Sequence, residues 1–523
     1  MAEPYDIVIR NGRVLDGHGN PWVRADIGIR DGRLAKIGRV TGPATREIDA
    51  ADRYVTPGWI DMMDQSGWAL RRNGLAESKL RQGVTTLIAG ESGAPAPSGK
   101  LAAWFDRLAE KGISPNFGTY YGAAQARVEV MGDVDGRPTP EQLDRMRAHV
   151  AEAMETGAFG IATALIYPPD SFQTTDDLVA LSEVAARYGG IYASHMRDES
   201  AALLEGIAES IEIGRRARIQ VEIFHFKAAY AEGWGKLTRQ AGEMIEAARA
   251  AGVNIAADMY VYAAGGTGVD ITTPNWVWAE GRAAGLERLK DPAVRARIKA
   301  EVAEGSQPGW SNLVHAAGGW ERVVLVNAHS EAFDRFQLKS LAAIGEALGR
   351  DPSEVACDII LAAPDKRPTA LYFLMSEPDI EEALRFPWMS IGSDADASPG
   401  PGETGPLGMP HPRAFGNHPR VIAEYVKARG VLSLEDAVRK MTSWPATRMG
   451  LNDRGSLREG LWADVTIFDY ERIADRATYE NPTAYPEGID YVLVNGALVI
   501  DEGRHTGAKP GHVLRGPGWT GAA

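Results

Sequence analysis

The sequence contains a single cysteine, Cys357, among 523 residues. One thiol cannot form a disulfide within the chain, and a zinc site built from several cysteines is excluded. The sequence also lacks a run of 18 apolar residues, and its first residues do not show the basic stretch followed by an apolar stretch that marks a signal peptide. We therefore expect a cytoplasmic protein without a transmembrane helix.

The sequence also has no excess of basic residues. The chain carries 56 lysines and arginines against 70 aspartates and glutamates, which gives a formal net charge of -14. This acidic balance argues against nucleic acid or an anionic membrane as the main partner. A small molecule remains the expected partner, and the oligomeric state stays open.

Turn and strand signals divide the chain into two β-rich ends and a long alternating middle. Residues 1–56 and 451–523 contain short alternating apolar runs with Asn-Gly and Asp-Gly pairs, which predict one small β-sandwich domain built from both termini. Residues 57–450 alternate between strand and helix candidates, and RVVLVNA at 322–328 is one of the strand candidates. This alternation favours an α/β fold with a (β/α)8 TIM-type barrel.

Two segments depart from the alternation. Residues 270–320 interrupt it and are expected to form an insertion of the kind that covers a site. Residues 395–420 are rich in proline and glycine and follow the last strand candidate, so we expect them on the catalytic rim. No G-x-G-x-x-G motif follows an early strand, which disfavours dinucleotide binding.

Two histidines end neighbouring strand candidates. His195 and His225 lie 30 residues apart, about the length of one strand–helix–strand unit, and each ends a short apolar run. In a barrel this spacing brings both imidazoles to the carboxyl ends of adjacent parallel strands, where such folds carry their chemistry. A single histidine at a strand end is more often structural, but two such histidines together indicate a metal.

Carboxylates end two further strand candidates. Glu91 ends GVTTLIAGE, and together with the two imidazoles it would complete a three-ligand zinc site with one open position. Zinc lowers the pKa of its bound water to about 7, which gives a zinc-bound hydroxide. Asp394 ends WMSIGSD and is either a general base or the cap of the following turn. Tyr260 ends NIAADMY and either donates to a carbonyl oxygen or is an ordinary buried tyrosine.

Three basic residues follow the same strand candidates. Arg197 and Lys227 lie two residues beyond the histidines, and Arg413 lies in the rim loop. Any of them could pair with a substrate carboxylate. Equally, they could bind acidic neighbours at the rim, such as Asp198 and Glu199.

Taken together, these motifs resemble the D-aminoacylase (N-acyl-D-amino-acid deacylase) family of the amidohydrolase superfamily. The resemblance extends over most of the chain and is carried by LRQGVTTLIAGE, GGIYASHMRDES, HFKAA, DMYVYAAGGTG and IGSDADA. It implies a (β/α)8 barrel with a small β-sandwich, and hydrolysis of the amide in N-acyl-D-amino acids. It also implies site residues: His195 and His225 as metal ligands, Asp394 as the catalytic aspartate, Tyr260 to polarise the carbonyl, and Lys227 and Arg413 to hold the substrate carboxylate.

The sequence departs from the family pattern at two places. Where the family has I-D-x-H-x-H, this chain reads IDMMDQ, so Met63 and Gln65 replace both histidines. Both are poor zinc ligands, and the second metal position is expected to stay empty, with Gln65 contacting substrate or water instead. At the register of the family cysteine stands Ser92, beside Glu91, which favours Glu91 as the ligand. No lysine lies in FGIATALIYPP, so a carbamylated lysine is not supported.

We therefore expect an amidohydrolase with one zinc ion, which cleaves a linear amide of a small substrate that carries a carboxylate. A second possibility is a related enzyme that acts on another C–N bond or catalyses a cyclisation. A third is a metal-free scaffold, which the joint presence of His195, His225 and Asp394 disfavours.

Overall fold

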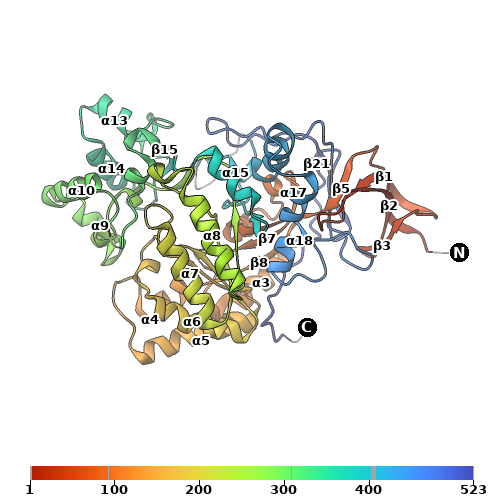
Figure 1. Cartoon of the computed structure of the whole chain (residues 1–523), viewed down its shortest axis with the longest axis horizontal. Coiled ribbons are helices and arrows are strands. Elements are labelled where there is room, and N and C mark those ends of the chain that lie inside the picture. The colour runs from red at the N-terminus through yellow and green to blue at the C-terminus, as the bar shows by residue number, and fades with distance from the viewer. Residues whose placement is uncertain (1–2, 92, 308, 402–407, 522–523) are drawn as a thin grey trace.

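A computed structural model describes residues 3–91, 93–307, 309–401 and 408–521 of the chain. Ser92, named above, lies outside the described residues. Figure 1 shows a strand-rich end, a middle in which helices surround strands, and a second lobe at the opposite end. Among the described helices, none is long and apolar enough to span a membrane.

Both ends of the chain contribute to one nine-stranded sheet. Its strands are β1 (Tyr5–Val14), β2 (Val23–Arg30), β3 (Arg33–Gly38), β4 (Ala44–Asp49), β5 (Tyr54–Pro57), β18 (Val465–Phe468), β19 (Ile489–Val494), β20 (Ala497–Asp501) and β21 (Arg504–His505). β5 and β18 pair antiparallel, with Val55 opposite Ile467, and so join the two ends. Asp31-Gly32 and Asn495-Gly496 form two-residue hairpin turns with positive φ at both residues, as their sequences predict.

The middle of the chain contains two parallel sheets, β6-β7-β8 and β9-β10-β11-β12-β13-β17, which follow one another as one row of strands. They are β6 (Trp59–Asp64), β7 (Val84–Ala89), β8 (Asn116–Thr119), β9 (Tyr121–Gly122), β10 (Gly160–Ala164), β11 (Ile191–His195), β12 (Gln220–Ile223), β13 (Ile255–Met259) and β17 (Met389–Ile391). Only Tyr120 separates β8 from β9, and the Asp394 amide donates to the Met63 carbonyl at 2.8 Å. A parallel bridge between Asp64 and Ala395 also brings the two ends of the row together. All carboxyl ends of these strands therefore lie on one side.

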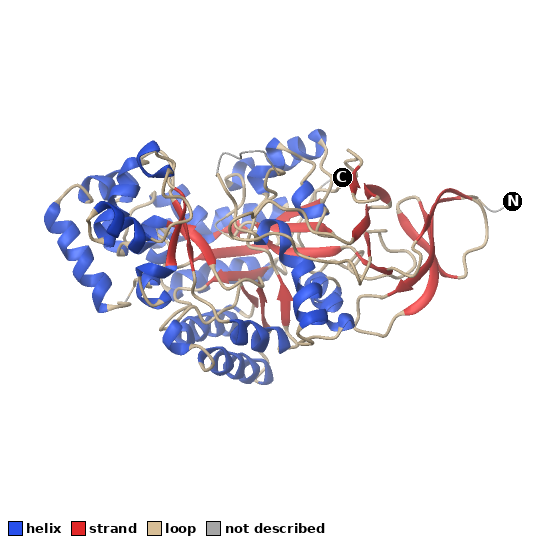
Figure 2. Cartoon of the chain, turned by 90° about the horizontal axis from the view of Figure 1, so that it is seen from above, coloured by secondary structure: helices blue, strands red, loops and turns tan. Residues whose placement is uncertain are grey.

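Helices connect and cover these strands, as Figure 2 shows for the blue helices around the red middle strands. The longer helices are α3 (Ser98–Lys111), α4 (Ala123–Met131), α5 (Pro140–Thr156), α6 (Thr175–Arg187), α7 (Leu203–Ala217), α8 (Leu237–Ala250), α15 (Glu377–Arg385), α16 (Arg413–Arg420) and α17 (Leu434–Met441). The shorter ones include α1 (Gly67–Arg72), α2 (Glu77–Leu80) and α18 (Ser443–Arg448), and a π-helical segment covers Val421–Ala428. In α7, Leu203, Ile207, Ser210, Gly214 and Ala217 recur every three or four residues and are all buried.

The lobe at the other end is inserted between β13 and β17 (Figure 1). It contains β14 (Gly265–Gly268), β15 (Val323–Asn327), β16 (Thr369–Tyr372), α9 (Gly281–Arg288), α10 (Pro292–Glu304), α11 (Leu313–Ala317), α12 (Glu331–Asp334), α13 (Leu341–Leu348) and α14 (Pro352–Ala362). RVVLVNA forms the predicted strand, but this strand does not join the parallel strands of the expected barrel. β15 pairs antiparallel with β16, which in turn pairs antiparallel with β14, so these strands form a separate sheet. The interruption therefore extends well beyond the expected 270–320.

Candidate metal centre

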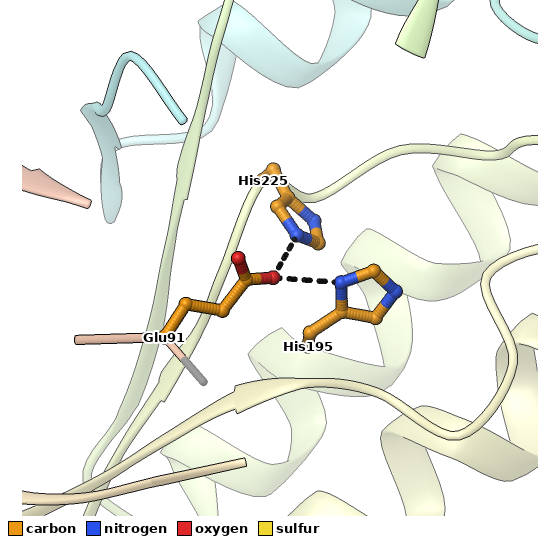
Figure 3. A group of neighbouring side chains, drawn as sticks. All are labelled: Glu91, His195 and His225. Carbon is orange, nitrogen blue, oxygen red and sulfur yellow. Dashed lines mark hydrogen bonds and ion pairs between the residues drawn. The ribbon is translucent and has the colours of Figure 1, made fainter. Parts of the chain in front are cut away.

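Three side chains from three strand ends meet at one point (Figure 3). His195 is the last residue of β11, His225 follows β12 by two residues, and Glu91 follows β7 by two residues. The Glu91 Oε1 atom lies 2.8 Å from His195 Nδ1 and 3.0 Å from His225 Nε2. One atom from each residue falls within 4.8 Å of the others, and all three residues are buried. The convergence predicted from the strand ends is confirmed.

This donor set fits a zinc ion. Two imidazole nitrogens and a carboxylate oxygen are the ligand types of catalytic zinc, whose ligand atoms lie about 3.4 Å apart at metal–ligand distances of about 2.1 Å. Burial alone would raise the pKa of Glu91, but hydrogen bonds with His195 and His225 outweigh burial and hold that pKa well below its usual value. Glu91 is thus kept in the ionised form that binds a cation. Among the described residues, these three form the only group with such geometry.

Glu199 supports the histidines from the other side. Its Oε1 lies 2.8 Å from His225 Nδ1, and its Oε2 lies 3.6 Å from His195 Nε2. The carboxylate is buried and orients the His225 ring so that Nε2 faces Glu91. Burial would lower the pKa of His225, but the Glu199 carboxylate raises it to about 10, so a metal ion must displace a proton there. The sequence named Glu199 only as a possible partner of the rim cations, and nothing local distinguishes it from Asp198.

Lys227 lies beside Glu199 rather than free in solvent. Its ammonium is 2.7 Å from Glu199 Oε2 and donates to the His225 carbonyl at 2.8 Å. This contact matches the alternative considered for the basic residues, that they bind acidic neighbours. The ammonium also lies 5.7 Å from the centre of the Tyr260 ring, so Lys227 remains at the edge of the site.

Gln65 connects the metal-ligand group to Asp394. Its amide nitrogen donates to Glu91 Oε2 at 2.5 Å and to Asp394 Oδ1 at 3.3 Å. Met63, the other residue at a family histidine position, is buried in an apolar cluster with Ile88 and Phe224. Neither side chain offers an imidazole to the centre.

Arg413 joins Asp394 to Tyr260. Its Nη1 lies 2.8 Å from Asp394 Oδ2, and its guanidinium lies 4.4 Å from the centre of the Tyr260 ring. Arg413 and Tyr260 are both buried. The structure therefore links Glu91, Gln65, Asp394, Arg413 and Tyr260 in one continuous chain of contacts.

Arg197 is the one candidate that the structure does not bring to the site. Its guanidinium binds Glu209 at 2.9 and 3.0 Å and donates to the carbonyls of Ser171 and Gln173, both at 2.9 Å. Four of its five N–H groups thus donate to these acceptors and tie α7 to the loop after β10. The cation follows His195 in sequence but points away from the centre.

A cavity of about 1030 Å³ opens onto the centre. Its inner wall carries the predicted residues Gln65, Glu91, His195, Asp394 and Arg413. Its outer wall includes residues of the inserted lobe and of the rim loop, among them Asp270, Trp278, Arg367 and His411. The space is large enough for a small substrate with an extended acyl group or side chain.

Comparison with known proteins identifies the class to which this fold and site belong. The sequence profile of the amidohydrolase family matches residues 312–500. An N-acyl-D-glutamate deacylase of Alcaligenes xylosoxydans xylosoxydans is 33% identical, over 98% of this chain and 97% of that protein. A D-aminoacylase of the same organism is 32% identical, over 98% of each chain.

Solved structures give the same result. A D-aminoacylase with a binuclear metal centre, activated by one metal and attenuated by the second, superposes with a TM-score of 0.81 at 28% identity, over 98% of this chain and all of that one. The N-acyl-D-glutamate deacylase of Bordetella bronchiseptica, complexed with zinc and a phosphonate inhibitor, gives 0.80 at 30% identity, over 98% and 100%. The chain belongs to the amidohydrolase family. Within it, the relatives just named are D-aminoacylases and N-acyl-D-glutamate deacylases that match over nearly the full length, which confirms the resemblance stated from the sequence.

Proposed function

We propose that this protein is a zinc-dependent hydrolase that cleaves the amide bond of N-acyl-D-amino acids. One observation carries the proposal: Glu91, His195 and His225 converge on one point. The side-chain amide of Gln65 connects Glu91 to Asp394 by hydrogen bonds to both carboxylates. The end-to-end similarity to D-aminoacylases and N-acyl-D-glutamate deacylases supports the substrate class. A metal-free scaffold would have no need to keep three ligand-type side chains in contact.

We propose for the scaffold a closed (β/α)8 barrel over residues 57–450, with a β-sandwich built from 1–56 and 451–523. The contacts of Met63 and Asp64 with the segment after β17 support closure of the barrel. The antiparallel pairing of β5 with β18 supports one terminal domain. The lobe inserted before β17 contributes the outer wall of the cavity.

One zinc ion held by Glu91, His195 and His225 would activate a water molecule and polarise the substrate carbonyl. Asp394 is the general base: its carboxylate takes a proton from the attacking water and returns it to the nitrogen of the leaving amine. The Arg413 guanidinium lies 2.8 Å from Asp394 Oδ2 and helps to hold the carboxylate in place. Gln65 holds the other carboxylate oxygen and fixes the direction in which Asp394 presents it.

Tyr260 is the hydrogen-bond donor to the carbonyl oxygen as negative charge develops there. Burial is the main reason that the pKa of Tyr260 lies above its ordinary value, so the phenol stays protonated at neutral pH. Arg413 and Lys227, whose cationic groups lie 4.4 and 5.7 Å from the centre of the Tyr260 ring, would pair with the substrate carboxylate. Arg197 has no part in this assignment because Glu209 already binds it.

An enantiomer assay tests the function directly. Purified protein loaded with one equivalent of zinc is incubated with N-acetyl-D- and N-acetyl-L-forms of glutamate and methionine, and the free amino acid is measured. Release from a D-form at a rate well above that from its L-form supports the proposal. Failure to release either enantiomer, with zinc bound, contradicts it, and ring opening of a hydantoin instead would assign the enzyme to another C–N bond.

A further inference from the structure

Lys79 lies on the short helix α2 and its side chain is fully buried. Its ammonium contacts two carboxylates of β6, Asp61 Oδ2 at 3.0 Å and Asp64 Oδ2 at 2.8 Å. It also donates to Ser393 Oγ at 2.7 Å and to the Ala395 carbonyl at 2.6 Å. One buried cation therefore ties the first strand of the parallel row to the segment after the last.

The two contacts after β17 flank Asp394 on both sides. Asp61 holds the same segment a second time, because its Oδ1 accepts from the Ser393 amide at 2.9 Å. Asp394 itself has a φ of 50°, a left-handed conformation that is uncommon for residues other than glycine, although aspartate adopts it more often than most. Asp394 thus has a left-handed backbone conformation and lies between Ser393 and Ala395, both of which accept a hydrogen bond from Lys79.

We propose that Lys79 is a positioning residue for Asp394: its buried ammonium fixes the 393–395 backbone so that the carboxylate points at the metal centre. This inference rests on the proposed function, in which Asp394 is the general base. Lys79 does not line the cavity, so it acts through Ser393 and Ala395 and not on substrate. A buried ammonium suits this task because its hydrogen bonds are directional, and the two carboxylates of β6 compensate its charge.

The structure supplies a matched control for the loss of a buried lysine. Lys440 on α17 is also fully buried, and its ammonium donates to the carbonyls of Phe386 and Met389, at the other end of the same strand β17. Replacing Lys440 removes a buried cation and loosens the start of β17, without touching the 393–395 segment. Replacing Lys79 removes a buried cation next to Asp394.

The experiment compares Lys79→Met with Lys440→Met in the zinc-loaded, full-length protein. Small displacements of a catalytic group lower rates strongly, so Lys79→Met is expected to lower kcat by roughly 10- to 100-fold. Its KM should change by less than about threefold and its zinc content should stay at one per chain, because no metal ligand contacts Lys79. Lys440→Met should keep kcat within about threefold of the parent. A merely structural role would lower kcat, melting temperature and zinc content of both variants together.

Ser393→Ala tests the same contact if Lys79→Met does not fold. It removes only the hydroxyl through which Lys79 reaches the residue before Asp394, and it is expected to lower kcat by about 3- to 10-fold with KM unchanged. Unchanged kcat in a folded, zinc-loaded Lys79→Met or Ser393→Ala variant would overturn the positioning role. An active Asp394→Asn variant would instead overturn the assignment of the base, and a zinc-loaded parent that releases no amino acid from N-acyl-D-amino acids would overturn the proposed function, so these failures are distinguishable.

Discussion

Gln65 donates its amide nitrogen to Glu91 Oε2 at 2.5 Å, while the other oxygen of the same carboxylate faces both imidazoles. A neutral amide thus occupies the side of Glu91 that points toward Asp394. In a solved D-aminoacylase the centre is binuclear, and the second metal attenuates the activity. In this chain Gln65 already bridges the two carboxylates, and Met63 is buried in apolar packing.

We predict that excess zinc does not attenuate this enzyme. Glu91 and Asp394 can share a second cation only if the Gln65 amide leaves its position between them, and no histidine stands at position 63 or 65 to replace it. Isothermal titration of metal-free protein should give one zinc per chain, and kcat should stay constant from one to about ten equivalents. Two tight sites, or a loss of activity as the second equivalent binds, would contradict the prediction.

Gln65→Ala should lower activity without releasing the metal. The substitution removes the hydrogen bond that orients Asp394 but leaves all three ligands, and loss of one such bond costs about 1 to 2 kcal/mol, or roughly 5- to 30-fold in kcat. Zinc content by mass spectrometry is measured on the same sample. A metal-free variant would show that Gln65 is itself a ligand.

Asp394→Asn should abolish turnover by removing the proton acceptor while keeping the geometry. General-base catalysis contributes about 100- to 10,000-fold, so kcat should fall within or beyond that range. The zinc content should remain one per chain because Asp394 is not among the three converging ligands. Substantial turnover by the zinc-loaded variant would refute the assignment of the base.

Glu199→Gln should weaken zinc binding by about 10- to 100-fold, because residues that orient ligating histidines typically have effects of this size. The affinity is measured by competition with a chelator of known zinc affinity. Glu205→Gln is the matched control, since Glu205 is exposed in the first turn of α7. Equal affinities of the two variants would rule out a supporting role for Glu199.

Arg413→Met should impair substrate binding, whereas Arg197→Met should impair only the stability of the fold. Loss of a charged hydrogen bond to the substrate carboxylate costs about 1.5 to 3 kcal/mol, so Arg413→Met should lower kcat/KM by roughly 10- to 150-fold. It should also lose any preference for an N-acyl-D-amino acid over its carboxamide. Arg197→Met should lower the melting temperature, because Glu209 loses its partner, yet keep KM. A raised KM in the Arg197 variant would return that residue to the site.

The metal centre could be predicted from the sequence because its geometry follows from one rule. Side chains at the carboxyl ends of neighbouring parallel strands converge, and short apolar runs mark those ends for Glu91, His195 and His225. The hairpins at Asp31-Gly32 and Asn495-Gly496 were predictable for a similar reason, since their turn type demands positive φ at both residues.

The remaining features depend on contacts between distant segments. Lys79 meets Ser393 across 314 positions, and Glu199 reaches His225 only because α7 and β12 return the chain to the same end of the strands. Arg197 follows His195 closely in sequence, but Glu209 on α7, 12 residues further on, binds it. β15 has the composition of a buried strand, and only its partner β16 decides which sheet it joins.

Diffraction from a zinc-loaded crystal at the zinc absorption edge tests the central claim most directly. The account predicts one strong anomalous peak per chain, with Glu91, His195 and His225 as its protein ligands and Asp394 facing it without binding. A map without a peak between the two imidazoles, or with a second full peak beside Gln65, would contradict the account.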